Sequence, residues 1–237
     1  MNTLLQRNDL EITQMTQNIL AVHPHPDDEI SKAGALAKHV KNGDKVTLIC
    51  ATSGQMGRRM GKPLFANRET LARLREGELR ASCNAIGIDD IRLWRMQDKT
   101  VQFRNPEELA NRIETVIAEV EPSIVYTFYP GHGVHPDHNA IGAATVLAVS
   151  RFARDKQPTV YGTCMTGTCS DTLGEPDIKL DVSDVIEEKM NAFRAHRSQS
   201  ELDTIQLDEE LRVAPNKRKE ILAQYLTEYF WIYKTQH

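Results

Sequence analysis

The sequence predicts an α/β fold, a Rossmann-like arrangement of three layers with a mainly parallel sheet in the middle. Short apolar runs rich in β-branched residues alternate with longer stretches of helical period, which is the pattern of strand-helix-strand units. Loops with Gly, Pro and ionisable residues follow the first, second and fourth expected strands. In an open α/β sheet ligands bind at the carboxyl ends of the strands, so we expect the functional site there.

The elements follow from these runs in chain order. Strands are expected where the apolar, β-branched runs lie, at residues 18–23, 45–51, 91–95, 123–129, 159–165 and 178–182. Helices are expected in the amphipathic stretches between them, at residues 30–42, 68–86, 106–120 and 137–154. Two further helices close the chain: one over 183–196 with Ser183 as its N-cap, and one over 208–229, where four apolar residues have roughly helical spacing: Leu211, Ile221, Leu222 and Tyr225.

Length and charge limit the class of protein. The 237 residues suit one domain, expected over residues 18–237 after an N-terminal extension over residues 1–17. Against 33 acidic residues there are 29 basic ones, a net charge of −4, which argues against a nucleic-acid or polybasic membrane surface. No apolar stretch approaches the roughly 20 residues that a bilayer requires, and the first 17 residues contain no apolar signal segment. We therefore expect a cytoplasmic protein with a small-molecule partner and no nucleic acid or membrane partner.

The four cysteines are Cys50, Cys83, Cys164 and Cys169, and no two of them form a C-x-x-C pair. A reducing cytosol keeps such residues as thiols, so we expect four structural thiols.

The first cluster of chemistry-bearing residues follows the first expected strand, where the chain reads HPHPDDE from His23 to Glu29. The two prolines restrict the loop, so His25 and Asp28 can point at one site with little entropy left to lose. Histidine and aspartate are good zinc ligands. The alternative is that Asp27 or Asp28 caps the next helix while the two histidines are exposed.

The second cluster, HGVHPDH from His132 to His138, follows the fourth expected strand and opens a helix. If the strand order is 3-2-1-4-5, strands one and four are neighbours and the two clusters face each other. His25, Asp28 and one histidine of the second cluster would then give the three protein ligands of a catalytic zinc site, with the fourth position left for water.

Three other segments give weaker signals. The stretch from Gly54 to Lys62 has neither the spacing nor the Ser or Thr of a Walker loop, and no G-x-G-x-x-G occurs in the chain. Its basic residues, Arg58, Arg59 and Lys62, either meet an anionic substrate or form a solvated loop. The segment REGE from Arg75 to Glu78 is, taken alone, a set of solvent-side pairs, and His196 is explained by a helix C-terminus.

These residues resemble the PIG-L/LmbE-like zinc-dependent N-acetylglucosaminyl deacetylases. The resemblance runs from about residue 18 to residue 199 and rests on PHPDDE, residues 24–29, and HPDH, residues 135–138. Within that family the chain resembles the second type of bacillithiol-biosynthesis deacetylase, by residues 54–59, 63–70, 128–138 and 195–199. Such enzymes remove acetate from N-acetylglucosaminyl-malate.

The resemblance implies a role for each site residue. It implies His25, Asp28 and His138 as ligands of one divalent ion per chain, zinc or alternatively ferrous iron, and Asp27 as general base. A protonated His135, oriented by Asp137, would stabilise the oxyanion. The resemblance implies that Arg75 and Asp98 bind the sugar, and Arg58 is a further candidate for substrate binding. Some relatives carry a Tyr where this chain has Val134, so tyrosine help to the oxyanion is absent from that position. A homo-oligomer is also expected.

Two other functions remain open at this point. One is a deacetylase acting on another N-acetyl sugar, a chitooligosaccharide or a glycolipid. The other is a non-catalytic sugar- or metal-binding module of the same fold, because a fold alone does not establish turnover. Asp27 discriminates between catalyst and binder, since a binding module needs ligands but no spare carboxylate beside the water.

Overall fold

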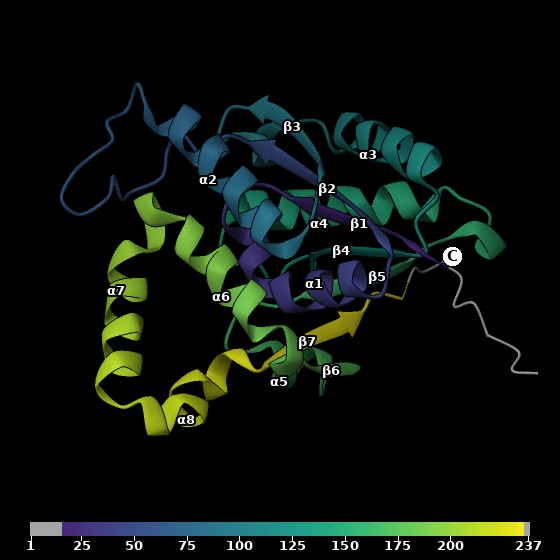
Figure 1. The fold of residues 1–237 in the computed structure, drawn as a ribbon. Helices are drawn as coiled ribbons and strands as arrows, with labels where there is room; N and C mark the ends of the chain where they lie inside the picture. Colours follow the sequence, from purple (N-terminus) through teal and green to yellow (C-terminus); the bar gives the residue numbers. More distant parts are fainter. Residues whose placement is uncertain (1–15, 235–237) are drawn as a thin grey trace, which may run out of the picture.

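The computed structural model describes residues 16–234. The expected extension over residues 1–17 therefore lies almost entirely outside the described residues. Figure 1 shows a central sheet with helices on both faces, which confirms the predicted three-layer α/β fold.

The sheet has seven strands in the order β3-β2-β1-β4-β5-β7-β6. Its first five strands are parallel to one another, and β7 runs antiparallel to both β5 and β6. The predicted order 3-2-1-4-5 is confirmed, so β1 and β4 are neighbours at the point where the order reverses. The strands are β1 Asn18–His23, β2 Lys45–Thr52, β3 Asp90–Met96, β4 Ile124–Phe128, β5 Thr159–Thr163, β6 Ile178–Asp181 and β7 Thr227–Ile232.

Two apolar cores lie on the two faces of the sheet, and β1 contributes to both. Ile19 and Ala21 point into one core, whereas Leu20 and Val22 point into the other, because successive side chains of a strand alternate between faces. All four are fully buried. Continuous apolar runs are therefore the correct signal for a parallel strand covered on both sides.

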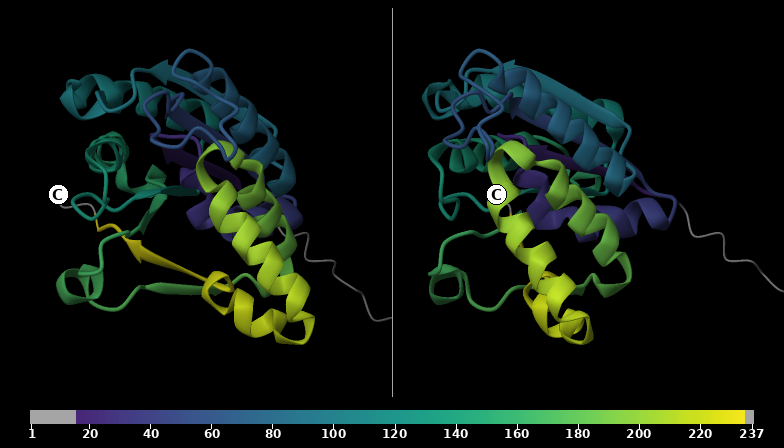
Figure 2. Two further views of the ribbon diagram at one scale, coloured as in Figure 1. Left: turned by 90° about the vertical axis from the view of Figure 1, so that its left-hand side faces the viewer. Right: turned by 60° about the vertical axis from the view of Figure 1, so that its left-hand side comes forward.

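Eight α-helices lie within the described part of the chain. The first core is covered by α1, α2 and α6, and the second by α3 and α4. Beyond them α7 and α8 form a smaller core with α6, and Figure 2 shows α7 beside the loop that follows β2. Their bounds are α1 Ala33–Lys41, α2 Leu71–Ile86, α3 Pro106–Val120, α4 Pro136–Ser150, α5 Cys169–Leu173, α6 Ile186–Ala195, α7 Arg197–Val213 and α8 Arg218–Leu222.

The prediction of one helix over residues 208–229 is wrong. Helix α7 ends at Val213, just before Pro215, whose missing N–H and ring do not suit a helix interior. The last residues of the predicted helix belong to β7, whose sequence TEYFWI is rich in aromatic and β-branched residues. The predicted N-cap is also wrong, since Ser183 opens a short 3-10 turn and α6 begins at Ile186.

The expectation of four thiols holds for Cys50 and Cys83, which are buried and free. It is wrong for Cys164 and Cys169, which form a disulfide. The turn between β5 and α5 brings their Cα atoms to 6.3 Å, a separation that a disulfide spans.

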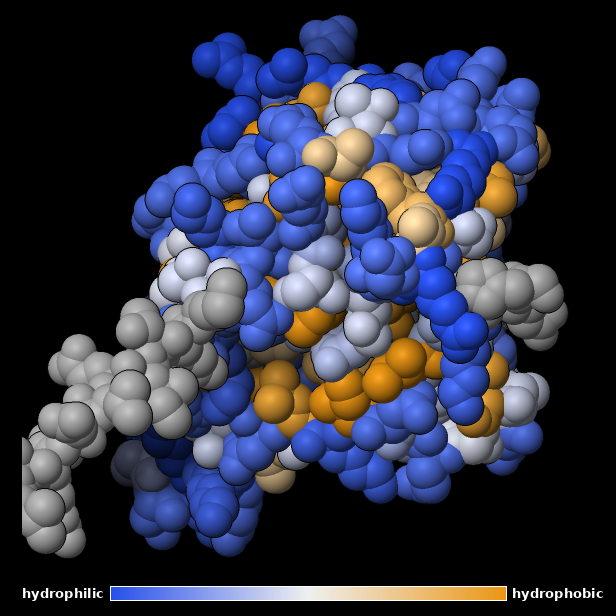
Figure 3. Space-filling view, turned by 90° about the vertical axis from the view of Figure 1, so that its right-hand side faces the viewer, coloured by the Kyte–Doolittle hydropathy of each residue, from blue (hydrophilic) through white to orange (hydrophobic). Residues whose placement is uncertain are grey.

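The surface at the amino ends of the parallel strands is shown in Figure 3. Hydrophilic side chains cover most of this face, and apolar ones reach the surface in patches among them. Among residues 16–234, no helix has the length and apolar character needed to cross a bilayer.

Candidate metal centre and active site

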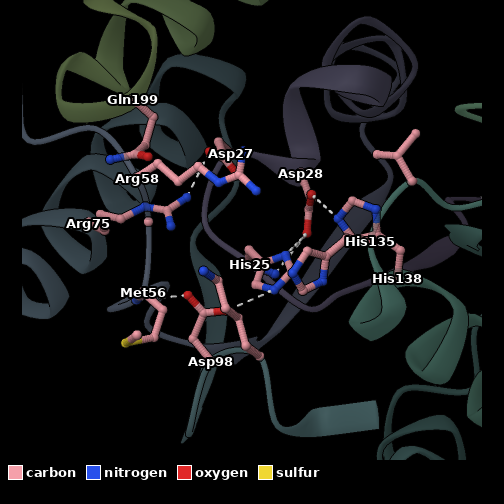
Figure 4. Close-up of a pocket in the computed structure, with 13 residues that line it drawn as sticks. His25, Asp27, Asp28, Met56, Arg58, Arg75, Asp98, His135, His138 and Gln199 are labelled. Carbon is pink, nitrogen blue, oxygen red and sulfur yellow. Dashed lines mark hydrogen bonds and ion pairs between the residues drawn. The ribbon is translucent and has the colours of Figure 1, made fainter.

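Two loops meet at the carboxyl ends of β1 and β4. The first carries His25, Asp27 and Asp28, and leads into a 3-10 turn over Asp28–Lys32. The second ends at His135, which is the N-cap residue of α4. Because β1 and β4 pair directly, the two predicted clusters face one another across the switch point, as Figure 4 shows.

His25, Asp28 and His138 form a compact group of ligand atoms. Each residue is at most 8% exposed, and one ligand atom from each lies within 4.8 Å of the others. The carboxylate of Asp28 lies between the histidines, with Oδ2 3.3 Å from His25 Nδ1 and Oδ1 3.0 Å from His138 Nε2. Burial raises the pKa of Asp28, but the histidines, His138 foremost, hold it well below its ordinary value. Two imidazoles and an ionised carboxylate suit zinc and leave a fourth position for water.

Two carboxylates beside Nε2 of His25 fix the orientation in which Nδ1 of the same ring faces the site. His25 Nε2 lies 3.1 Å from Asp98 Oδ1 and 3.3 Å from Asp137 Oδ2. Burial lowers the pKa of His25, but hydrogen bonds to three carboxylates, Asp137 foremost, hold it well above its ordinary value. Carboxylates on the outer nitrogen of a metal-binding histidine set its tautomer and orientation. This concentration of carboxylates around one imidazole also matches a bound cation.

Asp98 and Asp137 thus support His25, which differs from the roles that the resemblance implied. The other oxygen of Asp98 accepts a hydrogen bond from the backbone N–H of Met56 at 2.9 Å, so both of its oxygens are engaged. The carboxylate of Asp137 contacts His25 and accepts from the backbone N–H groups of Lys99 and Gln102. The carboxylate of Asp98 nevertheless lines the cavity, whereas the carboxylate of Asp137 faces His25 rather than His135.

His135 lies at the rim of the group, half-buried, with its ring 4.8 Å from that of His25. Its Nδ1 accepts the backbone N–H of Asp137 at 3.1 Å. Burial, followed by the charge of His25, lowers its pKa. The lowered pKa and the acceptor role of Nδ1 both favour a neutral ring with its proton on Nε2, whereas the resemblance implies a protonated His135.

Asp27 is held in a conformation that few residues other than glycine adopt, with φ 94° and ψ −16°. Its side chain makes no capping hydrogen bond, so the capping alternative is not what the structure shows. Its Oδ2 accepts from Arg75 Nη2 at 2.7 Å, and among residues 16–234 no donor contacts Oδ1. Burial raises the pKa of Asp27 to about 6, against the lowering effect of Arg75. The free oxygen of a carboxylate with this pKa suits a general base near neutral pH.

Arg75 is buried, and its guanidinium binds the loops around Asp27. It donates to the carbonyl oxygens of Pro26 and Gly54, and to Asp27. Gly54 is required at this contact, because its φ is 61° and a Cβ atom there would lie 2.1 Å from Arg75 Nη1. Although Arg75 lines the cavity, the contacts assign it to positioning Asp27 rather than to the sugar alone.

The segment from His196 to Gln199 supports the same loop from the other side. His196 is fully buried and forms a hydrogen-bonded pair with Glu29, while Glu29 Oε2 accepts the backbone N–H of Asp27 at 3.0 Å. Ser198 donates to Glu78 through both its N–H and its hydroxyl, each at 2.6 Å. Arg75 and Glu78 are therefore not solvent-side residues. His196 does stand at the C-terminus of a helix, α6, as expected, and its ring in addition pairs with Glu29.

No pattern in the sequence indicates the aromatic stack between Phe128 and His138. The ring of Phe128 lies parallel to that of His138, with centroids 4.0 Å apart, and the ammonium of Lys32 is 4.3 Å from the Phe128 ring. Lys32 is fully buried, and burial lowers its pKa to about 8. Packing on Phe128 fixes the plane of the His138 ring. His23 is the buried end of β1, in agreement with the strand expected at residues 18–23 and not with the alternative of an exposed histidine.

The metal group opens into a cavity of about 310 Å³. Most predicted site residues line it, and Asp137, which does not, contacts His25 from behind. Arg58 lines this cavity with an exposed side chain, but Arg59 is bound to Asp203, and Val134 stands exposed at the rim. The lining residues are His25, Asp27, Asp28, Met56, Gly57, Arg58, Arg75, Asp98, Lys99, Val134, His135, His138 and Gln199.

A second close group consists of His132, Cys164 and Cys169. Its two sulfurs are joined in the disulfide, so they offer no thiolate to a metal ion in this state. The group of His25, Asp28 and His138 thus has more suitable donors than this one. A third close group among the described residues, His25, His135 and Asp137, shares His25 with it.

Comparison with known proteins agrees with this geometry. Residues 20–149 match the family model described as PIG-L, GlcNAc-PI de-N-acetylase. Proteins of Bacillus cereus and Bacillus subtilis, both named probable N-acetyl-alpha-D-glucosaminyl L-malate deacetylase 2, are 44% and 42% identical over 221 residues, covering 93% of this chain and 99% of each relative. The solved N,N'-diacetylchitobiose deacetylase of Pyrococcus horikoshii shares the fold, with a TM-score of 0.69 and 22% identity over 92% of this chain and 84% of that one. The chain therefore belongs to the PIG-L (GlcNAc-PI de-N-acetylase) family.

Proposed function

We propose that this chain is a metal-dependent deacetylase that hydrolyses the acetamide of N-acetylglucosaminyl-malate, a step of bacillithiol biosynthesis. One observation carries the proposal: a buried His-Asp-His group and a carboxylate outside that group, Asp27, line the same cavity. A binding module would need the ligands alone. The substrate is inferred from relatives that are more than 40% identical over 93% of the chain and carry that name.

His25, Asp28 and His138 would hold the ion, which we propose to be zinc. When bound, a divalent ion polarises the amide carbonyl and lowers the pKa of water toward 7. The donor set fits zinc, and the carboxylates of Asp98 and Asp137 behind His25 would hold that ligand in place.

The chain's own residues would move the protons. Asp27, through its free Oδ1, takes a proton from the attacking water and later delivers it to the departing amine nitrogen, so that water and amide give acetate and amine. Arg75 keeps the other oxygen of Asp27 in place. The Nε2–H of neutral His135 donates to the oxygen of the tetrahedral intermediate, a contribution of about 3 kcal/mol for one well-placed donor.

A single assay tests the proposal. Acetate release by the zinc-loaded protein is measured with N-acetylglucosamine, N-acetylglucosaminyl-malate and diacetylchitobiose. The malate glycoside is expected to have the highest kcat/KM. Release of acetate from none of the three would favour a binding module, and a preference for diacetylchitobiose would overturn the assigned substrate.

A further inference from the structure

A second cavity adjoins the metal cavity and has no role in the chemistry described above. Its volume is about 470 Å³, and it shares Arg58 and Gln199 with the metal cavity. It lies between the loop that follows β2 and the start of α7, which are neighbours in Figures 1 and 2. A ligand in the metal cavity can therefore extend into it past Arg58 and Gln199.

The walls of this cavity are tied to each other. Gly61 N–H donates to the carbonyl of Ser198 at 3.1 Å, and Lys62 N–H donates to Glu201 Oε2 at 2.7 Å. Gln199 Nε2 donates to the carbonyl of Arg59 at 2.8 Å, and Arg59 returns a hydrogen bond to the carbonyl of Gln199 at 2.7 Å. These bonds hold the loop against α7, so the cavity is built into the structure.

The cavity carries an excess of positive charge. Four cationic side chains line it, against one carboxylate, Glu201: Arg58, Arg59, Lys62 and Arg197. Arg59 is neutralised by Asp203 at 2.8 Å, and Arg197 shares Glu201 at 3.1 Å. Among residues 16–234, neither the guanidinium of Arg58 nor the ammonium of Lys62 has a carboxylate within ion-pair distance.

Sugar geometry connects the two cavities. In a 2-acetamido sugar the acetamide is on C2 and the aglycone is on C1, the neighbouring carbon. An acetamide placed at the metal group therefore leaves the aglycone attached one carbon away, from where it can extend toward the opening that the two cavities share. Met60, Leu64 and Leu202 also line the second cavity and can contact the carbon atoms of an aglycone.

We propose that this second cavity is the aglycone subsite and that Lys62 and Arg197 select aglycones that carry carboxylates. The inference rests on the proposed function and specifies how that site chooses among substrates. Carboxylates bind guanidinium and ammonium groups through charge-assisted hydrogen bonds. Lys62 supplies an unpaired ammonium, and Arg197 has N–H donors beyond the Nη2 group that contacts Glu201. A dicarboxylate such as malate meets this requirement, whereas the hydroxyl groups of an inositol or of a second sugar do not.

The test compares substrates within each variant. kcat/KM is measured for N-acetylglucosaminyl-malate and for the uncharged methyl glycoside of N-acetylglucosamine, and the ratio of the two values is the readout. Lys62→Gln and Arg197→Gln should each lower this ratio a few-fold through KM, as expected for loss of an exposed charge-assisted contact. Free malate should inhibit these variants correspondingly less well. The matched control is Arg80→Gln, an exposed residue of α2 that lines neither cavity.

A variant that is expected to raise the ratio distinguishes a change in substrate selection from a loss of folding. Glu201→Gln removes the carboxylate from the lining, so the ratio should rise a few-fold. A ratio unchanged in all three cavity variants, with acetate still released from both substrates, would overturn the subsite assignment while leaving the deacetylase intact. If the wild-type protein released acetate from neither substrate, the proposed function itself would fail.

Discussion

The buried pair between His196 and Glu29 is expected to contribute more to stability than any exposed ion pair of α7. Both side chains are fully buried, and Glu29 also accepts hydrogen bonds from Ser82 and from the backbone of Asp27. His196→Leu leaves the Glu29 charge buried without its partner. Breaking a buried pair in this way costs about 3–5 kcal/mol of unfolding free energy.

The assay is urea denaturation of wild-type and variant proteins in the same metal-loaded state at pH 6. The matched control is Arg212→Leu, which breaks the exposed pair with Glu209 on α7, the helix that begins directly after His196. This change should leave the unfolding free energy nearly unchanged. The double variant Glu29→Gln, His196→Gln removes both charges and should lose less than His196→Leu. Equal losses for His196→Leu and Arg212→Leu would refute the reasoning.

The pair also predicts how its contribution changes with pH. The charge of Glu29 helps to raise the pKa of His196 above its ordinary value despite burial, so this contribution is fully present below pH about 6.5 and is lost as the pH rises through the folded value. His196 in turn lowers the pKa of Glu29, whose contribution is present above pH about 4.3 and is lost as the pH falls through the folded value. The stability difference between wild type and His196→Leu should therefore be largest between these limits.

Three further predictions concern the metal group and its neighbours. His25→Ala and His138→Ala should each lose the bound ion in elemental analysis, whereas His132→Ala should keep it; an ion retained in both ligand variants would contradict the assignment. His135→Ala should keep the ion and lower kcat by about 10²–10³, because one oxyanion donor is lost, and a KM effect alone would exclude that role. In the metal-free protein, carbon NMR should give a pKa of about 6 for Asp27, and Arg75→Gln should raise it further, because the Arg75 charge lowers it; a decrease would contradict the ion pair.

The parallel core of the fold was predictable because its signals are local. β1 is a continuous apolar run between polar ends, and both of its faces are buried as such a run requires. The C-terminal elements were harder, because the buried face of β7 includes Glu228. That carboxylate accepts from Lys189 and from the N–H groups of Gly34 and Ala35 in the first turn of α1, contacts that no periodicity in the sequence reveals.

The meeting of the two loops that carry the metal group was also predictable, since each loop follows a strand and the strand order brings these ends together. His138 as the third ligand came only from the resemblance. The supporting residues were not predictable. Glu29, Phe128 and Lys32 act through contacts with side chains distant in sequence, and a buried lysine over an aromatic ring resembles any other lysine in a sequence. The carboxylates of Asp98 and Asp137 could be placed near the site, but only the three-dimensional contacts show that both face His25.

The central claim is that two adjacent carboxylates have different roles, Asp28 as a metal ligand and Asp27 as the general base. Asp27→Asn tests it most directly. Metal content and steady-state acetate release from N-acetylglucosaminyl-malate are measured on the same preparation. The variant should keep its ion, because Asp28 and the two histidines remain, and its KM should change little, while kcat falls by about 10²–10⁴ with the loss of the general base. A variant that holds its ion and releases acetate at the wild-type rate would contradict the account.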